Sequence, residues 1–306
     1  MNAASRTPSQ HSLKHLHLQA AQELMQAGFG PEEAMREARV LIQLATGMDV
    51  TRQLSHSETE LSDAQQLELE ALIHRRAESE PMAYLAGSKE FFGLEFSTSP
   101  ATLIPRPDSE TLVETALGYL PSDKAARVLD LGTGTGCLLL SVLHQRPFAH
   151  GVGVDIQPDA VGLAAHNARQ LELAGRTDFH IGSWFTGLPE GTSPFDVILS
   201  NPPYITTREM TQLMPDVRDW EPRSALHGGE DGLDAYRIIA AEAANWLAPG
   251  GVLLFEIGRT QGADVAALGM AAGLLHRGTK NDLAGNARVV ALQAPGSHAY
   301  LSNDLL

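Results

Sequence analysis

From about residue 108 onward, short apolar runs alternate with stretches of helical periodicity. The runs are RVLDL (127–131), GVGVD (151–155), DFHI (178–181), FDVILS (195–200), GVLLFE (251–256) and ARVVAL (287–292). The helical stretches lie around 108–120, 137–145, 158–173, 234–247 and 260–272. Apolar strands separated by helices are typical of a parallel sheet that is covered on both faces. The sequence therefore predicts an α/β fold with a doubly wound, mostly parallel sheet in residues 108–306.

The first 86 residues have a different pattern and predict a small all-helical region. Apolar residues at three-and-four spacing favour helices over about 13–27, 31–46 and 62–78. Pro81 is expected to end this helical region. Residues 87–107 then mix aromatic residues with glycine and several prolines, which indicates a β-hairpin or an extended connector.

Charge and cysteine content argue against several classes of protein, although a local basic patch can still bind nucleic acid despite the acidic total. Lys and Arg total 22 against 37 Asp and Glu, for a formal net charge of −15, whereas nucleic-acid binders contact phosphates with basic clusters. The single Cys137 permits no internal disulfide and suits a reducing compartment. No apolar run approaches the ~20 residues of a membrane helix, and the N-terminus lacks the apolar segment of a secretory signal. We therefore expect a soluble cytoplasmic protein with no membrane partner and no direct nucleic-acid partner.

The strongest local motif is VLDLGTGTG, residues 128–136. A strand ends here, and Gly132, Gly134 and Gly136 form the turn into the next helix. Glycine permits positive φ and a close approach of a ligand to the backbone. The dinucleotide fingerprint would have its third glycine at the position of Cys137. The tighter spacing therefore favours a ligand without a pyrophosphate, whose amino-acid end lies against the loop; a glycine-rich turn that binds nothing is the alternative.

Asp155 closes the next predicted strand, 23 residues after Gly132. An acidic side chain at this place can accept hydrogen bonds from both hydroxyls of a ribose. The alternative is an N-cap for the helix that begins near Pro158, and the two roles are compatible.

The second strong motif is Asn201-Pro202-Pro203-Tyr204, directly after the strand FDVILS. The carboxyl end of a strand is where open α/β sheets bind ligands, and the two prolines restrict the backbone. A planar amide nitrogen, in a glutamine side chain or a nucleobase amino group, is a poor nucleophile because its lone pair is delocalised. The Asn201 side-chain oxygen and the Pro202 carbonyl can hold its two hydrogens and aim the lone pair at an electrophilic methyl, with Tyr204 stacked on the flat group. The alternative is a proline-rich break after a strand.

These motifs resemble the class I S-adenosylmethionine-dependent methyltransferases, and within them the HemK/PrmC family of release factor glutamine N5-methyltransferases. The resemblance runs over almost the whole chain and includes LIPRPDSETLVE, DLGTGTG, SNPPYI, DVRDWEP, ALHGGEDGLDAYRII and DLAGNAR. NPPY alone is shared with amino-methyltransferases of DNA and RNA, whereas IPRP and DGLDAYR are typical of the protein-modifying branch. The resemblance implies a helical substrate-recognition domain (1–86), a hairpin connector (87–107) and a Rossmann-like methyltransferase domain (108–306).

The resemblance also implies a reaction and the residues that carry it. The cofactor would be S-adenosylmethionine, and the substrate would be the glutamine of the GGQ motif in peptide chain release factors. The adenine would lie by Trp184 and the ribose at Asp155. The methionine part would be wrapped by Gly132, Thr133, Gly134, Thr135 and Gly136. Asn201 would touch both cofactor and substrate. The substrate would be bound by Asn201, Pro202, Pro203 and Tyr204. The catalytic residues would be Asn201, Pro202 and Tyr204.

A few residues depart from this pattern or have a second interpretation. The family commonly has an acidic residue in place of Ser183, so the resemblance supplies no side-chain contact to the adenine amino group there. Trp184 has core packing as its alternative. Arg106 has two interpretations, a solvated side chain or a salt bridge to a local acid. His11, His15 and His17 predict a surface histidine cluster rather than a zinc site, because no carboxylate or cysteine accompanies them.

Other functions share parts of the pattern. A glutamine methyltransferase of a ribosomal protein uses the same chemistry, although LIPRPDSE is closer to the release factor branch. A nucleic-acid amino-methyltransferase flips a base into the site and ordinarily adds a basic recognition region. An NAD-dependent dehydrogenase shares the strand–loop–helix unit, but Cys137 breaks its glycine spacing. A non-catalytic adaptor that retains the cofactor fold is the remaining alternative.

Overall fold

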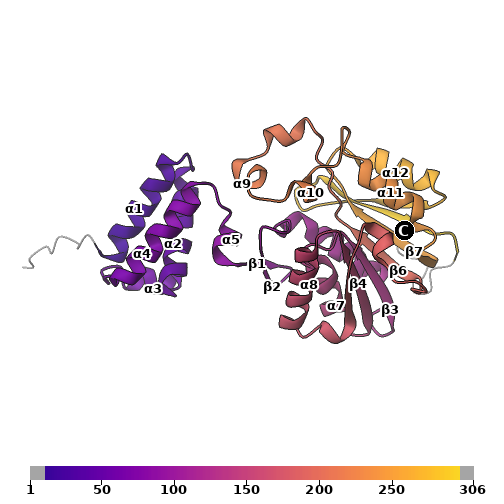
Figure 1. The fold of residues 1–306 in the computed structure, drawn as a ribbon, viewed down its shortest axis with the longest axis horizontal. Helices are drawn as coiled ribbons and strands as arrows, with labels where there is room; N and C mark the ends of the chain where they lie inside the picture. The colour runs from indigo at the N-terminus through magenta and orange to yellow at the C-terminus, as the bar shows by residue number, and fades with distance from the viewer. Residues whose placement is uncertain (1–10, 297–306) are drawn as a thin grey trace, which may run out of the picture. The chain divides into compact units, whose positions relative to one another are not determined.

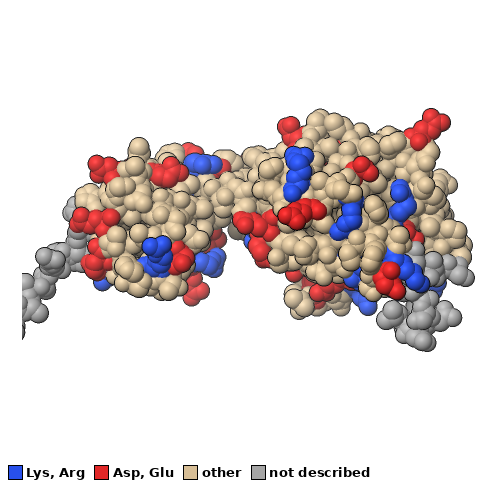
Figure 2. All heavy atoms as spheres, turned by 90° about the horizontal axis from the view of Figure 1, so that it is seen from below, with Lys and Arg blue, Asp and Glu red and all other residues tan. Residues whose placement is uncertain are grey.

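The computed structural model describes residues 11–296, and the chain divides into two compact units between Ala86 and Gly87. Each unit has a buried hydrophobic core of its own. On the face shown in Figure 2, acidic and basic side chains are interspersed. Within residues 11–296, no helix is both long and apolar enough to cross a membrane.

The first unit is a bundle of helices (Figure 1). Its helices are α1 (Leu13–Gln26), α2 (Pro31–Thr46), α3 (Val50–Ser55), α4 (Asp63–Ala77) and α5 (Met82–Ala86). The expected helices over 13–27, 31–46 and 62–78 are confirmed as α1, α2 and α4, whereas the short α3 and α5 were not expected. The expectation that Pro81 ends the helical region is wrong. Its carbonyl accepts the N–H groups of Tyr84 and Leu85, so Pro81 lies just before α5, a position that proline tolerates.

A buried ion pair lies inside this bundle. Arg76 donates from Nε to Oε2 of Glu37 at 2.7 Å and from Nη2 to Oε1 at 3.2 Å, and only 4% of its side chain is exposed. Its Nη1 donates to the carbonyl of Glu80 at 3.1 Å, and its guanidinium lies 4.2 Å from the Phe29 ring centroid. A charge that is buried with this many partners becomes costly when one partner is removed.

We expect Arg76→Met to destabilise the helical bundle by about 3–5 kcal/mol, because Glu37 is left buried without a counter-charge. Adding Glu37→Leu should recover most of the loss, since a well-packed apolar pair avoids the desolvation cost. Denaturant unfolding followed by far-UV circular dichroism measures the change. All the tryptophans lie in residues 87–306, so the fluorescence transition is an internal control that should not move. An Arg76→Met protein as stable as wild type would contradict the prediction.

The second unit contains a seven-stranded sheet in the order β5-β4-β3-β6-β7-β9-β8. Its strands are β3 (Ala126–Leu131), β4 (Ala149–Asp155), β5 (Thr177–Ile181), β6 (Phe195–Ser200), β7 (Leu247–Glu256), β8 (Leu275–Asn281) and β9 (Ala287–Gln293). Strands β3 to β7 are parallel, and β9 is antiparallel to β7 and β8. The predicted α/β fold with a mostly parallel sheet is confirmed. Strand β8 was missed because it is an edge strand with no buried residue.

Helices cover both faces of this sheet (Figure 1). The longer ones are α6 (Glu110–Tyr119), α7 (Cys137–Gln145), α8 (Pro158–Gln170), α11 (Asp234–Ala243) and α12 (Gly262–Ala271). The short ones are η1 (Pro107–Ser109), η2 (Ala174–Arg176), η3 (Trp184–Gly187), η4 (Glu209–Gln212), α9 (Pro215–Arg218) and α10 (Arg223–Leu226). The chain runs from β3 outward to β4 and β5, then returns to β6 on the other side of β3. The strand order therefore reverses between β3 and β6, which is where such sheets bind ligands.

The predicted hairpin is confirmed as β1 (Ser88–Phe91) paired antiparallel with β2 (Leu94–Ser97). Asn167 on α8 anchors it to the loop after β3. The Asn167 amide accepts from the Ser97 N–H at 2.9 Å and donates to the Ser97 carbonyl at 3.1 Å. The same amide nitrogen donates to the carbonyl of Thr135 at 2.9 Å. Asn167 is fully buried, so this one side chain fixes the hairpin against the glycine loop.

Candidate functional site

A cavity of about 290 Å³ lies where β3, β4 and β6 end. Its walls come from the connector residues 101–106, the loop 132–135, residues 154–157, residues 182–184, and from Asn201 and Pro203. Segments far apart in sequence therefore meet in one place. Gly136, Pro202 and Tyr204 are not among the lining residues.

The glycine loop turns away from β3 through positive φ angles. Gly132, Gly134 and Gly136 have φ of 76°, 55° and 80°. The N–H groups of Gly132 and Thr133 donate to the carbonyl of Val154 at 2.8 and 3.0 Å, which ties the loop to β4. A Cβ at position 136 would lie 3.1 Å from a Leu140 methyl carbon. Gly136 is therefore favoured by its positive φ and by tight packing behind the loop, whereas Gly132, Thr133, Gly134 and Thr135 line the cavity.

Asp130 lies beneath this loop, and the sequence predicted no role for it although it is part of the VLDLGTGTG motif. It is fully buried, and its Oδ2 accepts from Oγ1 of Thr133 at 2.8 Å. Its Oδ1 has no hydrogen-bond partner among the described residues. Burial raises the pKa of Asp130 to about 7, the Thr133 hydrogen bond opposes that rise, and the charge of Asp155 adds to it. The loop is thus held from below by a carboxyl group that resists ionisation.

Asp155 closes the loop from the side of β4. Its Oδ2 accepts from the N–H of Gly134 and its Oδ1 from the N–H of Gln157, both at 2.9 Å. An ionised carboxylate has about four acceptor positions, so each oxygen retains one for a ligand in the cavity that Asp155 lines. The alternative role as N-cap of α8 is wrong, because Gln157 occupies that position.

Trp184 both lines the cavity and packs against the core on the α11 side of the sheet. Its side chain is half-buried. Its φ is 50°, which is costly for a bulky side chain and is commonly found at functional sites. A Cβ at Gly132 would lie 3.6 Å from the indole ring. The ring and the glycine backbone therefore face each other, and Ser183 lines the cavity beside them.

The NPPY segment leaves β6 at the edge of the cavity. Asn201 and Pro203 line it, whereas Pro202 is buried. Tyr204 packs against the core on the α11 side, and burial raises its pKa to about 12. We therefore find Tyr204 beneath the segment rather than on the cavity wall, where stacking on a substrate would place it.

Two glycines of the sequence HGGEDGLD support this segment from behind. A Cβ at Gly228 would lie 2.6 Å from the carbonyl oxygen of Pro203, and one at Gly232 would lie 2.3 Å from that of Tyr204. Any larger residue would force the two segments apart. The N–H of Ile205 donates to the carbonyl of Leu226, and the N–H of Gly228 to that of Ile205, both at 2.9 Å. The sequence motif is thus explained by close backbone approach.

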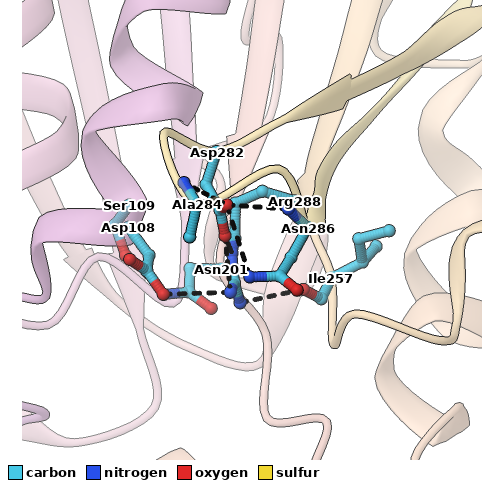
Figure 3. A network of polar contacts seen from close by, with 8 residues as sticks. All are labelled: Asp108, Ser109, Asn201, Ile257, Asp282, Ala284, Asn286 and Arg288. Carbon is cyan, nitrogen blue, oxygen red and sulfur yellow. Dashed lines mark hydrogen bonds and ion pairs between the residues drawn. The ribbon is translucent and has the colours of Figure 1, made fainter.

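A polar network continues behind Asn201 (Figure 3). Nδ2 of Asn201 donates to Oγ of Ser109 at 3.4 Å. Next to Ser109, Asp108 accepts from Nη2 of Arg288 at 2.9 Å, and the same Nη2 donates to Asp282 at 2.9 Å. Nη1 of Arg288 donates to the carbonyl of Ile257 at 3.3 Å. The start of α6, the NPPY segment and the DLAGNAR turn between β8 and β9 are therefore linked, and the sequence motifs did not indicate Ser109 or Arg288 as site residues.

Arg106 takes the salt-bridge alternative. It pairs with Glu221, whose other oxygen accepts from the N–H of Ile104 at 3.1 Å. Glu221 is buried, and burial raises its pKa while the Arg106 charge lowers it. The pair fastens the IPRP connector, which lines the cavity, to the DVRDWEP segment.

The expected surface histidine cluster is wrong for His17. That residue is buried between α1 and α2, its Nε2 is 2.9 Å from the Met35 carbonyl, and burial lowers its pKa. The reason is helical spacing: His17 lies on the same face of α1 as the buried Leu13, Ala20 and Leu24. In the described part of the chain, no group of three or more His, Cys, Asp or Glu side chains could hold a metal ion.

The fold agrees with that of known methyltransferases. A solved methyltransferase structure from Pyrococcus furiosus superposes with a TM-score of 0.51 at 18% identity, covering 72% of this chain and 98% of that one. A family model described as a methyltransferase domain matches residues 122–276, and one described as the PrmC N-terminal domain matches residues 15–87. The second unit thus has the class I methyltransferase fold.

Sequence relatives give the particular family. A release factor glutamine methyltransferase of Cereibacter sphaeroides is 44% identical over 271 residues, 89% of this chain and 95% of the relative. One of Salmonella typhimurium is 44% identical over 254 residues, 83% of this chain and 90% of the relative. This chain belongs to the release factor glutamine methyltransferase family.

The buried Asp130 makes stability depend on pH in a defined direction. Because its folded pKa is raised to about 7, the stability it contributes is fully present below the ordinary carboxyl pKa and is lost as pH rises through 7. We expect the unfolding free energy of the second unit to fall over this range, with up to about 1.4 kcal/mol per pH unit from this group. Asp130→Asn should flatten the slope in denaturant titrations followed by tryptophan fluorescence.

Asp196→Asn is the matched control. Asp196 lies at the other end of β6, where its Oδ2 accepts from the N–H of Arg127 at 2.8 Å. The Asp196→Asn variant should show the same change of unfolding free energy with pH as the wild-type protein. An Asp130→Asn slope equal to the wild-type slope would show that Asp130 ionises normally in the fold.

Proposed function

We propose that this protein transfers a methyl group from S-adenosylmethionine to the side-chain amide nitrogen (N5) of the glutamine in the GGQ motif of peptide chain release factors. The observation that carries the proposal is one cavity in which the glycine loop after β3 and Asn201 after β6 face the same space. Membership of the release factor glutamine methyltransferase family supports the choice of substrate. Release factors act in translation, so we assign the reaction to the cytoplasm.

The cavity residues fit S-adenosylmethionine. The glycines at 132 and 134 present backbone without side chains, as the amino-acid end of a ligand requires. Asp155 retains acceptor positions for ribose hydroxyls, and Trp184 offers an aromatic face for the adenine. S-adenosylmethionine has no pyrophosphate. It therefore needs neither a basic side chain to pair with phosphates nor the longer glycine turn of a dinucleotide-binding loop. When bound, S-adenosylmethionine supplies an electrophilic methyl group on a sulfonium sulfur.

The residues of the NPPY segment orient the nucleophile. We assign to Asn201 Oδ1 and the Pro202 carbonyl the two hydrogens of the substrate amide, so that the nitrogen lone pair is directed at the methyl group. Alignment of this kind can contribute ~7–11 kcal/mol to lowering a barrier. The same two acceptors stabilise positive charge that grows on nitrogen during transfer. Pro203 forms the wall beside them, and Tyr204 holds the segment from below.

Methyl transfer to purified release factor tests the proposal directly. Labelled S-adenosylmethionine should methylate the release factor at the GGQ glutamine, and mass spectrometry of the peptide locates the group. Ribosomal protein and DNA, assayed in parallel, represent the alternatives. Methylation of either one in preference to the release factor would replace this proposal with the corresponding alternative.

We expect Asn201→Ala to keep the fold and most cofactor affinity but to lose most methyl transfer. Loss of the oxygen leaves a substrate hydrogen unpaired, a cost of ~1–3 kcal/mol for a ground-state hydrogen bond. The transition state should suffer more, because that oxygen binds more strongly as charge develops on nitrogen. Single-turnover rates at saturating cofactor measure the effect. Asn245→Ala, an exposed asparagine outside the cavity, is the control, and a near-normal Asn201→Ala rate would reduce NPPY to a structural turn.

We also propose that residues 1–86 select the substrate, since they form a compact unit with their own core and match the PrmC N-terminal domain over 15–87. Removing them should leave cofactor binding largely intact, because every cavity residue lies after position 100. Methylation of intact release factor should fall strongly. Calorimetry with the cofactor and initial-rate assays with the release factor separate the two effects, and equal rates for the full and shortened chains would refute the assignment.

A further inference from the structure

Glu256 is a buried carboxyl group that the proposed mechanism leaves without a role. It is the last residue of β7, and β7 pairs with β6 so that Phe255 lies opposite Ser200. Glu256 is the next residue on β7, and Asn201 directly follows β6. The two residues are therefore adjacent at the carboxyl edge of the sheet. Glu256 is 2% exposed and does not line the cavity, whereas Asn201 does.

The side chains of Ser109 and Asn201 both act on the Glu256 carboxyl group at close range, since each of them lowers its pKa. Within the described residues, Oε2 of Glu256 has no hydrogen-bond partner. The Glu256 backbone carbonyl accepts from the Tyr236 hydroxyl at 2.8 Å, which fixes the strand end. The carboxyl group is thus held in place and lies behind Asn201 as seen from the cavity.

This contact decides which way the Asn201 amide faces. An ionised carboxylate only accepts hydrogen bonds, so the amide must present its NH₂ group to Glu256. Ser109 Oγ also lies at Nδ2, at 3.4 Å. With the amide nitrogen turned toward these two groups, Oδ1 is left for the cavity. The opposite rotamer would set an amide oxygen against a carboxylate and would direct hydrogen-bond donors at a substrate NH₂ group that is itself a donor.

We propose that Glu256 is a positioning residue for methyl transfer: its carboxylate fixes the Asn201 amide with Oδ1 toward the substrate and strengthens that oxygen as an acceptor. The inference rests on the proposed function for its catalytic consequence. A negative charge behind the amide also favours positive charge on the substrate nitrogen. Glu256 itself touches neither substrate nor cofactor and acts through Asn201.

The surroundings of Glu256 place its ionisation near neutral pH. Burial raises its pKa to about 7, against the hydrogen bonds from Ser109 and Asn201 and the charge of Arg288. The titratable and charged groups that interact with it come from η1, α7, the NPPY segment, α11 and β9; they are Asp108, Cys137, Tyr204, Tyr236 and Arg288. Burial raises the pKa of Cys137 and Tyr204 to about 12, and it raises the pKa of Tyr236 well above its ordinary value. Of the groups with raised pKa values in this set, Glu256 alone titrates near neutral pH.

The contact can be observed without any enzyme assay. The side-chain ¹⁵N–¹H₂ resonances of Asn201, assigned by their absence in Asn201→Ala, should shift with pH in the wild-type protein with a midpoint near 7. In Glu256→Gln the midpoint should vanish. Resonances that do not respond between pH 5.5 and 8.5 in the wild-type protein would overturn the inference, whether or not the variant folds.

Kinetics then test the consequence. At saturating cofactor, which removes any effect of Asp130 on cofactor binding, the wild-type single-turnover rate should rise with pH through 7 as Glu256 ionises. Glu256→Gln should be about 10-fold slower at pH 8 and flat with pH, since a neutral acceptor forms a hydrogen bond about half as strong as a charged one. The apparent affinity for cofactor should be unchanged. Asp196→Asn, the same chemical change at the far end of β6, should behave as wild type.

A double-variant cycle separates positioning from a general structural effect. If Glu256 acts through Asn201, adding Glu256→Gln to Asn201→Ala should not slow transfer further, whereas independent effects would multiply. If the effects of the two substitutions multiply, the inference about Glu256 is overturned. The same holds if Glu256→Gln transfers methyl groups as fast as an active wild-type enzyme. Either result would leave the proposed function intact. A wild-type enzyme that does not methylate release factor would instead overturn the proposed function.

Discussion

The parallel pairing of β3 with β6 is the constraint on which the site depends. Because the strand order reverses between them, the loops that follow these two neighbours turn to opposite faces and leave an open space at the carboxyl edge of the sheet. The glycine loop follows β3 and Asn201 follows β6, so the loop that we propose binds the cofactor and the residue that we propose orients the substrate become neighbours, although they lie far apart in the sequence. The pairing register, Leu131 opposite Ser200, then fixes their relative height.

Close backbone approach is the second condition, and glycine meets it on both sides of the cavity. The loop at 132–136 runs at positive φ against the end of β4, and Gly228 and Gly232 let a later segment lie directly under the prolines. Side chains at these places would push the walls apart, as the distances of 2.3 and 2.6 Å to carbonyl oxygens indicate. The cavity is therefore shaped by backbone, whose position packing fixes more firmly than that of a flexible side chain.

The sequence predicted the elements whose signal is local. The strands β3 and β6 are short, mostly apolar runs, so the sequence pattern alone places the motifs that follow them at strand ends. Ser109, Glu256 and Arg288 were missed because their roles depend on strand and loop pairings across more than fifty positions of sequence. Yet Glu256 had a usable signal, a carboxylate at the carboxyl end of a predicted apolar strand. Strand β8 and helix α5 lacked one, being a polar edge strand and a single helical turn after a proline.

Two buried carboxyl groups, Asp130 and Glu256, lower the stability of the fold next to the cavity. Each is fully or almost fully buried, each has one oxygen without a partner among the described residues, and each has a pKa raised to about 7 by burial. An apolar residue in either place would remove a desolvation penalty. Both instead stand one layer behind a cavity wall, Asp130 under Thr133 and Glu256 beside Asn201. The sheet is therefore less stable near neutral pH than its packing alone would make it, and the places where it loses stability are those where polar groups must be held in one orientation.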